Sequence, residues 1–322
     1  MIGMLIPDAL RRQLFSDADL ARLDALGGLR LHAGPTAPDE AAAARLLAGC
    51  SVAIGSWGTP GPSPAIVAAN PGLRLWEHAA GTVKHFFGPH TAGLAIASCK
   101  GAIAETVAEQ VLGTLIVALR GFPCNLAANR QGPAAKPAQL KVLACSRIGV
   151  VGASAVGRRV IARLRAAGAE VAVCDPFLAQ DGAAALGAAL LPLHELCAAC
   201  DAVTVHVPLL PATRRMLRRE HFAAMPDGAV LVNTARGECL DEAALIAELE
   251  RGRITACLDV TSPEPAAADS PLRRLANVWL TSHLAGPACR LIGRQAADDV
   301  AAFLAGGHPA DLITPDMLER IA

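Results

Sequence analysis

The chain has 322 residues, 53% of them hydrophobic and 18% charged, and its formal net charge is zero. A chain of this length exceeds one typical domain, so the sequence predicts two domains with substantial cores. The balanced charge excludes a strongly basic chain. We therefore expect neither nucleic acid nor an anionic membrane as a partner.

The N-terminal residues 1–15, MIGMLIPDALRRQLF, contain no cationic stretch followed by a long apolar run. They fit a first strand that leads into a helix, so we expect no secretory signal. Elsewhere, charges, glycines and prolines interrupt the apolar stretches before the ~18 residues that a membrane span needs. These features predict a soluble, cytoplasmic protein.

The first hundred residues alternate between short apolar strands and helical stretches, which predicts a first α/β unit ending near residue 100. Strands are predicted at 1–7, 29–33, 51–57, 73–79 and 93–99. Helices are predicted at 17–26, 39–48 and 64–69. A further helix is predicted at 101–121, where Thr106 and Glu109 fit a capping box. Residues 121–146 hold three prolines and are expected to form an irregular connection that carries short structure.

A second α/β series follows. Its strands are apolar on both faces, as in a sheet covered by helices on both sides, and they are predicted at 147–152, 169–175, 201–207, 228–234, 254–260 and 277–282. Helices are predicted at 156–167, at 241–251 with Asp241 as N-cap, and at 289–307 with Gly306 and Gly307 as the stop.

The ten cysteines are scattered through apolar segments, so we expect small buried hydrophobic side chains in a reducing compartment. Cys197 and Cys200 form a C-x-x-C pair, but no second ligand pair accompanies them. We therefore expect no metal site. A structural or redox role for the thiols stays as an alternative.

A glycine-containing turn between a strand and a helix indicates a dinucleotide site. Gly152 and Gly157 frame the pattern G-x-S-x-x-G, in which Ser154 replaces the usual middle glycine. The free amides of such a helix N-terminus favour a phosphate. Asp175 ends the next strand roughly twenty residues on, where a carboxylate can accept bonds from ribose hydroxyls and repel a 2′-phosphate. The pattern favours NAD over NADP; the alternative is a turn aspartate before Pro176.

Three polar residues leave later strands at the same predicted edge: Arg236, Glu264 and His283. The planar guanidinium of Arg236 suits a substrate carboxylate and can polarise a neighbouring carbonyl. A carboxylate such as Glu264 would stabilise the protonated form of His283, which suits a general acid. Asp259 can either make structural hydrogen bonds or hold the nicotinamide amide.

These motifs resemble the D-isomer-specific 2-hydroxyacid dehydrogenase family over nearly the whole chain. The stretches that carry the resemblance are GASAVGRRV, VCDPF, HVPLLPATRRML, VNTARGECLDEAAL, LDVTSPEP, TSHLAG and, in the first unit, HAAGTVKHF. The resemblance implies NAD-dependent interconversion of a D-2-hydroxy acid and its 2-oxo acid.

The resemblance also implies roles for individual residues. Arg236 matches the arginine that binds the substrate carboxylate and carbonyl, and Glu264 matches the acid that pairs with the catalytic histidine, here His283. Asp259 matches the nicotinamide-binding aspartate, and Asp175 the ribose-binding acid. The other implied cofactor contacts are Gly152, Ser154, Ala155, Val156, Gly157, Val207, Pro208, Thr213, Thr234, Ala235 and Gly286. The backbone amides of Gly81 and Thr82 match those that hold the substrate carboxylate.

The implied fold is α/β, with two Rossmann-like domains built on doubly wound parallel sheets. A flavodoxin-like substrate domain would comprise residues 1–102 and 287–322, and an inserted NAD-binding domain residues 103–286. The family also implies a homodimer, with the helix at 106–120 as its interface. Unlike longer members of the family, the chain is expected to lack a C-terminal regulatory domain. It also departs from the family pattern at Ser154, at Ala155 in place of a common arginine, at Ile103 in place of a common asparagine, and in residues 121–146.

Other functions remain open on this scaffold. Oxidation of a small anion such as phosphite is compatible with the Arg236, Glu264 and His283 set, whereas formate oxidation is disfavoured because that subgroup has glutamine in place of Glu264. A corepressor-like protein that binds NAD(H) without catalysis is a second alternative. The sequence names neither the substrate nor the direction of the reaction.

Overall fold

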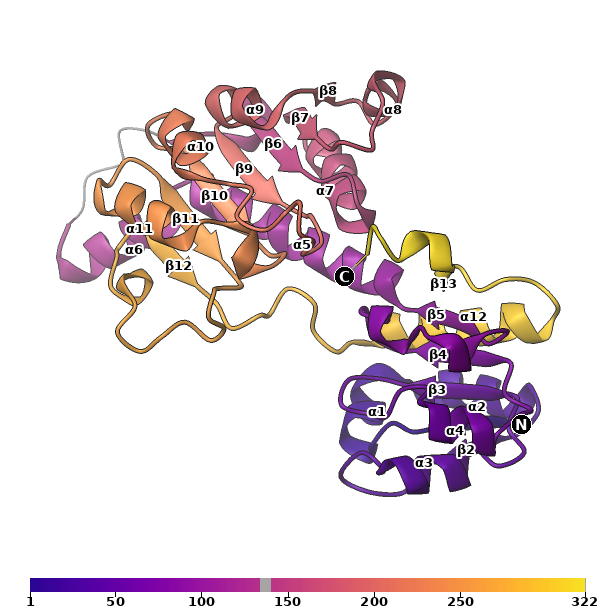
Figure 1. Cartoon of the computed structure of the whole chain (residues 1–322). Coiled ribbons are helices and arrows are strands. Elements are labelled where there is room, and N and C mark those ends of the chain that lie inside the picture. The colour runs from indigo at the N-terminus through magenta and orange to yellow at the C-terminus, as the bar shows by residue number, and fades with distance from the viewer. Residues whose placement is uncertain (134–139, 322) are drawn as a thin grey trace. The chain divides into compact units, whose positions relative to one another are not determined.

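The computed structural model describes residues 1–133 and 140–321. The chain forms two compact units, one comprising Met1–Ile103 and Pro287–Ala322 and the other Ala104–Gly286 (Figure 1). Helix α5 (Lys100–Leu119) begins in the first unit and continues into the second. The first unit is thus built from both ends of the chain, and the second is inserted between them.

The first unit contains a six-stranded sheet in the order β13-β5-β4-β3-β1-β2. All neighbouring strands are parallel except β13, which pairs antiparallel with β5. The order 2-1-3-4-5 is that of flavodoxin-like sheets. The strands are β1 (Ile2–Met4), β2 (Leu29–Leu31), β3 (Val52–Gly55), β4 (Leu75–His78), β5 (Ala95–Ser98) and β13 (Leu312–Ile313).

Helices cover both faces of this sheet with two separate apolar clusters. One cluster joins the strands to α1 (Asp8–Leu14), α2 (Asp17–Ala25) and α12 (Arg290–Leu304). The other joins them to α3 (Glu40–Leu46) and α4 (Pro64–Ala69). Short 3₁₀ turns complete the unit at η1 (Lys84–Phe86), η2 (Pro89–Thr91) and η6 (Pro315–Met317).

The second unit contains a seven-stranded parallel sheet in the order β12-β11-β10-β9-β6-β7-β8. Numbered from its first strand, this is the Rossmann order 3-2-1-4-5-6 with a seventh strand added. The strands are β6 (Arg147–Val151), β7 (Glu170–Cys174), β8 (Ala189–Leu190), β9 (Ala202–Val205), β10 (Val230–Asn233), β11 (Thr255–Leu258) and β12 (Val278–Leu280). The predicted fold class, α/β with two doubly wound sheets, is confirmed.

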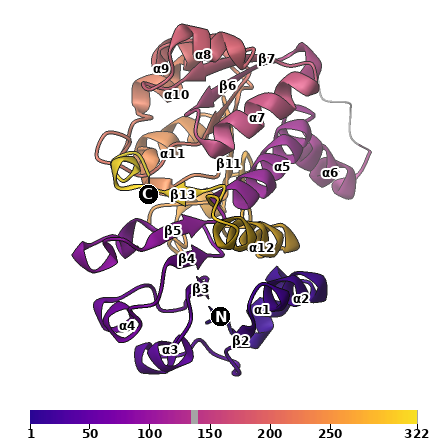
Figure 2. The same ribbon diagram turned by 90° about the vertical axis from the view of Figure 1, so that its right-hand side faces the viewer.

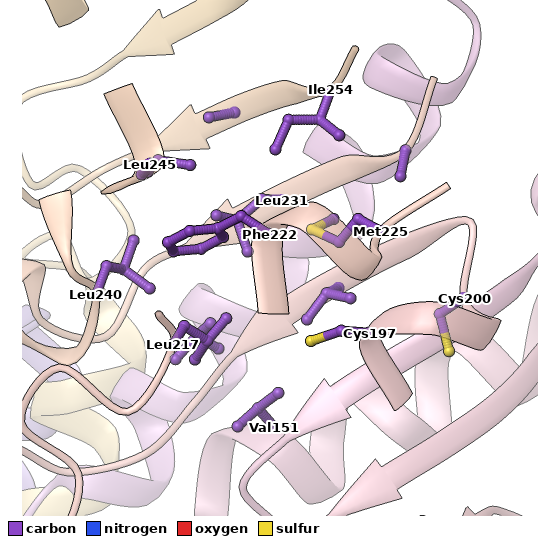
Figure 3. Packing of buried hydrophobic residues seen from close by; sticks show 14 of the residues in the cluster. Val151, Cys197, Cys200, Leu217, Phe222, Met225, Leu231, Leu240, Leu245 and Ile254 are labelled. Atoms are coloured by element: carbon purple, nitrogen blue, oxygen red, sulfur yellow. The ribbon is translucent and has the colours of Figure 1, made fainter. Parts of the chain in front are cut away.

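Helices lie on both sides of the second sheet. Figure 2 shows α7 (Ala155–Ala166) and α5 on one side and α9 (Leu193–Ala199), α10 (Arg219–Ala224) and α11 (Glu242–Glu250) on the other. The latter three pack on the strands through a large buried cluster that includes Leu231, Phe222 and Leu245 (Figure 3). The remaining elements are α6 (Phe122–Gln131), α8 (Gln180–Ala185), η3 (Leu143–Cys145), η4 (Gly237–Cys239) and η5 (Pro271–Arg273).

One local prediction about the linking segments was wrong. Helix α5 starts at Lys100, so Thr106 lies inside the helix and does not form a capping box with Glu109 at its start. The segment 121–146, expected to be an irregular connection that carries short structure, contains α6; its residues 134–139 lie outside the described part of the chain. By contrast, Asp241 caps α11 as predicted, accepting a bond from the amide of Ala244 at 3.1 Å.

Helix α5 is long and largely apolar, although Glu105, Glu109 and Gly113 interrupt its apolar stretch. Within residues 1–133 and 140–321 it is the one helix that is long and apolar enough to cross a membrane by length and composition. Ala104, Ala108, Val111 and Leu115 recur at helical spacing and are fully buried. One face of α5 is therefore a core face.

The cysteines behave mostly as apolar side chains. Cys197 and Cys200 both lie in the buried cluster of the second unit, at α9 and its end (Figure 3). Burial raises the pKa of each thiol to about 12. Thiolates are the reactive and metal-binding form, so this pair is poorly suited to redox or zinc chemistry. Among the described residues, no group of histidine, cysteine and acidic side chains is arranged to hold a metal ion.

Candidate active site

The polar residues singled out in the second unit follow the carboxyl ends of its strands. These ends are in register across the sheet, from Cys174 and Val151 through Val205 and Asn233 to Leu258. In open parallel α/β sheets, ligands bind outside this edge, at the point where the strand order reverses. Here the reversal falls between β6 and β9.

The turn after β6 has the close packing of a dinucleotide-binding loop. Gly152 has a φ of 97°, and a Cβ there would lie 2.8 Å from the carbonyl oxygen of His206. A Cβ on Gly157 would lie only 1.9 Å from the carbonyl oxygen of Gly152. Both positions therefore require glycine, which lets α7 start directly against the end of β6.

Ser154 does more than replace a glycine in this turn. Its hydroxyl caps α7 by accepting from the amide of Gly157 at 3.4 Å. The same hydroxyl donates to the carbonyl oxygen of His206 at 2.8 Å, which joins the turn after β6 to the end of β9. Serine therefore stabilises the turn that the usual glycine would leave without a side chain.

Two further observations indicate that a dinucleotide fits at the carboxyl edge of this sheet. Ala155 and Val156 occupy the first positions of α7, where backbone amides have no acceptor within the helix, so they are available to a phosphate. The hydroxyl Oγ1 of Thr234, after β10, is buried and has no hydrogen-bond partner in the described part of the chain. An orphaned buried hydroxyl fits a site that a ligand completes.

Asp175 links the glycine turn to the end of β7. Its carboxylate accepts from the amide of Ala153 at 2.6 Å and from that of Phe177 at 2.8 Å. Both the turn role and the ribose role considered from the sequence are compatible with this geometry. A carboxylate offers about four acceptor positions, so two remain for ribose hydroxyls.

The loop after β9 carries Val207, Pro208 and Thr213. Thr213 closes it by donating from Oγ1 to the carbonyl oxygen of Pro208 at 2.6 Å and accepting from the amide of Leu210 at 2.8 Å. His206, just before it, is buried, and burial lowers its pKa to about 3. This imidazole therefore stays neutral and serves as a packed, uncharged neighbour of the loop.

Arg236 follows β10 and is half-buried, and the side chain of Asn233 holds the backbone around it. The buried side chain of Asn233 donates to the carbonyl oxygen of Arg236 at 2.9 Å and accepts from the amide of Ala235 at 3.0 Å. The guanidinium donates from Nη1 to the carbonyl oxygen of Ala235 at 2.7 Å. Its remaining donors can bind a planar carboxylate.

The loop of Arg236 packs tightly against the loop that leads to Glu264. A Cβ on Gly237 would lie 2.1 Å from the carbonyl carbon and oxygen of Thr261, so only glycine allows this approach. Thr261 in turn donates from its hydroxyl to the carbonyl oxygen of Pro263 at 2.7 Å. The segment before Glu264 is thus shaped by its contact with the residue after Arg236.

Glu264 and His283 form the pair expected from the sequence. Nδ1 of His283 lies 2.6 Å from Oε1 of Glu264, and both side chains remain partly exposed. This bond makes Nδ1 the protonated nitrogen and leaves Nε2 free to face a substrate. His283 has a φ of 54°, a conformation uncommon outside glycine, which marks a residue held in place by its surroundings.

Asp259 is what holds the loop of His283. Its buried carboxylate accepts from the amides of Leu284 and Ala285, each at 2.8 Å, and from the hydroxyl of Thr281 at 2.6 Å. Its carbonyl oxygen accepts from the amide of His283 at 2.9 Å. Of the two roles considered from the sequence, this bonding supports the structural one, and it uses most of the acceptor capacity of the carboxylate.

The other predicted positions are Gly286, Gly81 and Thr82. Gly286 is the last residue of the second unit. Gly81 and Thr82 lie in the first unit, in the loop after β4. Their backbone amides donate no hydrogen bond to any residue that the structure describes, so both amides could donate to a bound anion.

Two contributors were missed from the sequence. Thr281 supports Asp259, and its place two residues before His283 in TSH was the available signal. In the first unit, Trp57 lies two residues after β3 and is 40% exposed, which is unusual for so large a side chain. The stretch SVAIGSWG, a buried strand followed by an aromatic residue and glycine, could have drawn attention to it.

Comparison with known proteins shows the family to which the chain belongs. The family model for the NAD-binding domain of D-isomer-specific 2-hydroxyacid dehydrogenases matches residues 112–285. The D-3-phosphoglycerate dehydrogenase of Methanocaldococcus jannaschii is 35% identical over 194 residues, which are 59% of this chain but 37% of that longer protein. The glycerate dehydrogenase of Methylorubrum extorquens is 32% identical over 227 residues, 66% of this chain and 70% of that one.

A solved structure of a phosphoglycerate oxidoreductase from Rhizobium etli has the same fold, with a TM-score of 0.81 and 23% identity over 97% of each chain. The chain belongs to the D-isomer-specific 2-hydroxyacid dehydrogenase family. Its second unit contains the NAD-binding domain of that family.

Proposed function

We propose that this protein is an NAD-dependent oxidoreductase that interconverts a D-2-hydroxy acid and its 2-oxo acid. The observation that carries the proposal is the 2.6 Å pair of His283 and Glu264, on a dinucleotide-binding sheet that also presents Arg236. An imidazole oriented by a carboxylate is a proton donor, and a guanidinium that follows a strand of the same sheet can recognise a substrate carboxylate.

The chain would bind NAD through its second unit. Gly152 and Gly157 allow close approach, Ala155 and Val156 offer free amides to the pyrophosphate, and Asp175 accepts from the ribose. The bound cofactor would supply the hydride that reduces a carbonyl carbon. Because a 2′-phosphate would lie against the Asp175 carboxylate, NAD is favoured over NADP.

The chain's own residues would handle the substrate and the proton. Arg236 binds the carboxylate of the 2-oxo acid and polarises its carbonyl group. His283, with Nδ1 held by Glu264, donates a proton from Nε2 to the carbonyl oxygen and takes it back in the reverse direction. The amides of Gly81 and Thr82 would bind the substrate carboxylate, and Gly286 would contact the cofactor.

The test is consumption of NADH, with NADPH in parallel, by the purified protein supplied with glyoxylate, hydroxypyruvate, pyruvate and bulkier 2-oxo acids. We expect turnover of at least one 2-oxo acid and a preference for NADH. Binding of NADH without turnover of any acid would instead favour a corepressor-like protein. Reduction of NAD by phosphite alone would favour the small-anion dehydrogenase.

We also propose a homodimer and a cytoplasmic location. The dimer is supported by an apolar hollow at α5 and α6, lined by Ile116, Val117, Arg120, Phe122 and Leu140. Ile116 is 44% and Phe122 54% exposed, as expected for side chains that a second copy would cover. Light scattering at micromolar concentration should give twice the mass of one chain, and Ile116→Asp should lower it.

A further inference from the structure

The loop after β3 holds an exposed indole at a defined place in the first unit. The amide of Thr59 donates to the carbonyl oxygen of Ser56 at 3.2 Å, which closes a turn around Trp57 and Gly58. Gly58 has a φ of 73°, the left-handed conformation that such a turn requires at its third position. Trp57 therefore stands at the tip of a rigid turn and is 40% exposed.

This turn is tied to the loop that carries Gly81 and Thr82. The hydroxyl of Ser56 donates to the carbonyl oxygen of Ala79 at 2.8 Å, and the amide of Ala79 donates to the carbonyl oxygen of Gly55 at 2.8 Å. Strands β3 and β4 are parallel neighbours, with Gly55 opposite His78, so both loops leave the same edge. Packing reinforces the link, because Gly61 lies directly against the ring of Phe86.

The topology independently indicates this edge as a ligand site. In the order 2-1-3-4-5 the direction of the strand sequence reverses between β1 and β3, and ligands bind outside the carboxyl ends at such a point. The turn around Trp57 follows β3 at that point. An exposed indole there offers a flat apolar surface with little conformational freedom to lose on binding.

The charges of the same loops do not favour a second anionic group. Between residues 56–63 and 79–87 the one lysine or arginine is Lys84, whose Nζ donates to the carbonyl oxygen of Ile321 at 3.2 Å. The exposed His85 packs edge-on against Phe86. A substrate phosphate would find one lysine and no arginine in these two loops.

We propose that Trp57 is a specificity-determining residue and that the substrate is a 2-oxo acid with an apolar side chain, aromatic or branched, rather than a phosphorylated one. The proposal rests on the oxidoreductase function above. The amides of Gly81 and Thr82 would fix the carboxylate, and the side chain of the substrate would lie against the indole of Trp57. Relatives named D-3-phosphoglycerate dehydrogenase differ in this respect, since that name specifies a phosphorylated substrate.

The experiment compares kcat/KM with NADH for glyoxylate, phenylpyruvate and 3-phosphohydroxypyruvate in the unsubstituted protein, Trp57→Ala and Trp57→Phe. Glyoxylate has no side chain and is the internal reference. We expect phenylpyruvate to be preferred to the phosphorylated acid. In Trp57→Ala the ratio of phenylpyruvate to glyoxylate should fall about 10- to 100-fold, mainly through KM, and Trp57→Phe should restore most of it.

Binding is read separately from turnover by quenching of tryptophan fluorescence on addition of phenylpyruvate to the NADH-loaded protein, which Trp57→Ala should reduce. Thermal unfolding checks that the variants are folded. Turnover of glyoxylate with an unchanged ratio in Trp57→Ala, or a preference for 3-phosphohydroxypyruvate, would overturn the role of Trp57 and leave the oxidoreductase function standing. Failure to reduce any 2-oxo acid would overturn both.

Discussion

The backbone amide of His283 donates to the carbonyl oxygen of Asp259 at 2.9 Å, and the carboxylate of the same aspartate receives the next two amides along the chain. Asp259 directly follows β11, so the loop that carries the imidazole is fixed to the rigid sheet by one residue. The left-handed backbone of His283 is maintained by these bonds. The direction of its side chain therefore depends on a residue that the reacting atoms need not touch.

Asp259→Asn tests this dependence. An amide group would place N–H donors against one or more of the backbone or hydroxyl donors that the carboxylate now accepts. We expect a loss of about 1–3 kcal/mol in the free energy of unfolding, the usual effect of an unpaired buried group. We also expect a lower kcat, measured by steady-state kinetics. Thr281→Val is the matched control, since it removes one hydroxyl and keeps the amide contacts; an equal loss in both variants would contradict the argument.

The proton donor is tested at His283 and Glu264. His283→Gln should lower kcat by about 10²–10⁴-fold, the usual contribution of a positioned acid, while NADH binding measured by fluorescence is retained. Glu264→Gln should have a smaller effect, because Nδ1 keeps an acceptor but loses its negative charge. Glu250→Gln, at an exposed acid of the same unit, is the control. Near-normal turnover in His283→Gln would refute the assignment.

The glycine turn is tested by Gly157→Ala. A methyl group 1.9 Å from the carbonyl oxygen of Gly152 must push α7 away from β6, which should weaken NADH binding and lower the melting temperature. Gly72→Ala in the first unit is the control, because its added methyl group would meet only the carbonyl oxygen of Cys50, at an ordinary van der Waals distance of 3.9 Å. This control should leave NADH binding and the melting temperature unchanged. Titration with NADH and calorimetry distinguish the two variants.

Glu77 of β4 should make the stability depend on pH. It is fully buried, and burial, with Asp299 as a further contributor, raises its pKa well above 4.5. The folded protein therefore holds a proton that the unfolded chain releases above pH 4.5, and stability is lost as the pH rises from there through the folded pKa. Glu77→Gln lacks this loss. The free energy of unfolding of the variant, relative to that of the unsubstituted protein, should therefore increase as the pH rises from 4.5 to 8. Denaturant titrations measure the difference, and Glu319→Gln, at an exposed acid, should show no such trend.

Much of the second unit could be predicted because its signals are local. Apolar strands, each followed by a glycine, acidic, arginine or histidine residue, predicted the sheet and the edge at which Asp175, Arg236 and His283 emerge. The pairing of Glu264 with His283 followed from strands that are neighbours. The sequence could not show whether Asp259 holds the loop of His283 or contacts the cofactor, since both roles require the same buried carboxylate at the end of a strand.

The first turn of α5 shows why other features could not be predicted. The helix predicted at 101–121 agrees with α5, which begins at Lys100, but the predicted capping box at Thr106 and Glu109 lies inside the helix. Its first amides are satisfied from distant parts of the chain: Gly101 donates to Asp311 and Ala102 to Gln295, each at 2.7 Å. No sequence window that includes the helix alone contains these partners. The short elements β8, α8 and α9 were missed for a related reason, because they are too brief to show a periodic pattern.

The continuity of α5 limits how this protein can be divided in the laboratory. The boundary between the units falls at Ile103 and Ala104, inside one unbroken helix rather than in a linker. A polypeptide trimmed to the nucleotide-binding half would begin without the carboxylate and amide groups that now satisfy the first turn. Anyone wishing to study that half by itself should retain the residues from Lys100 onward and supply a new cap, or expect a frayed end.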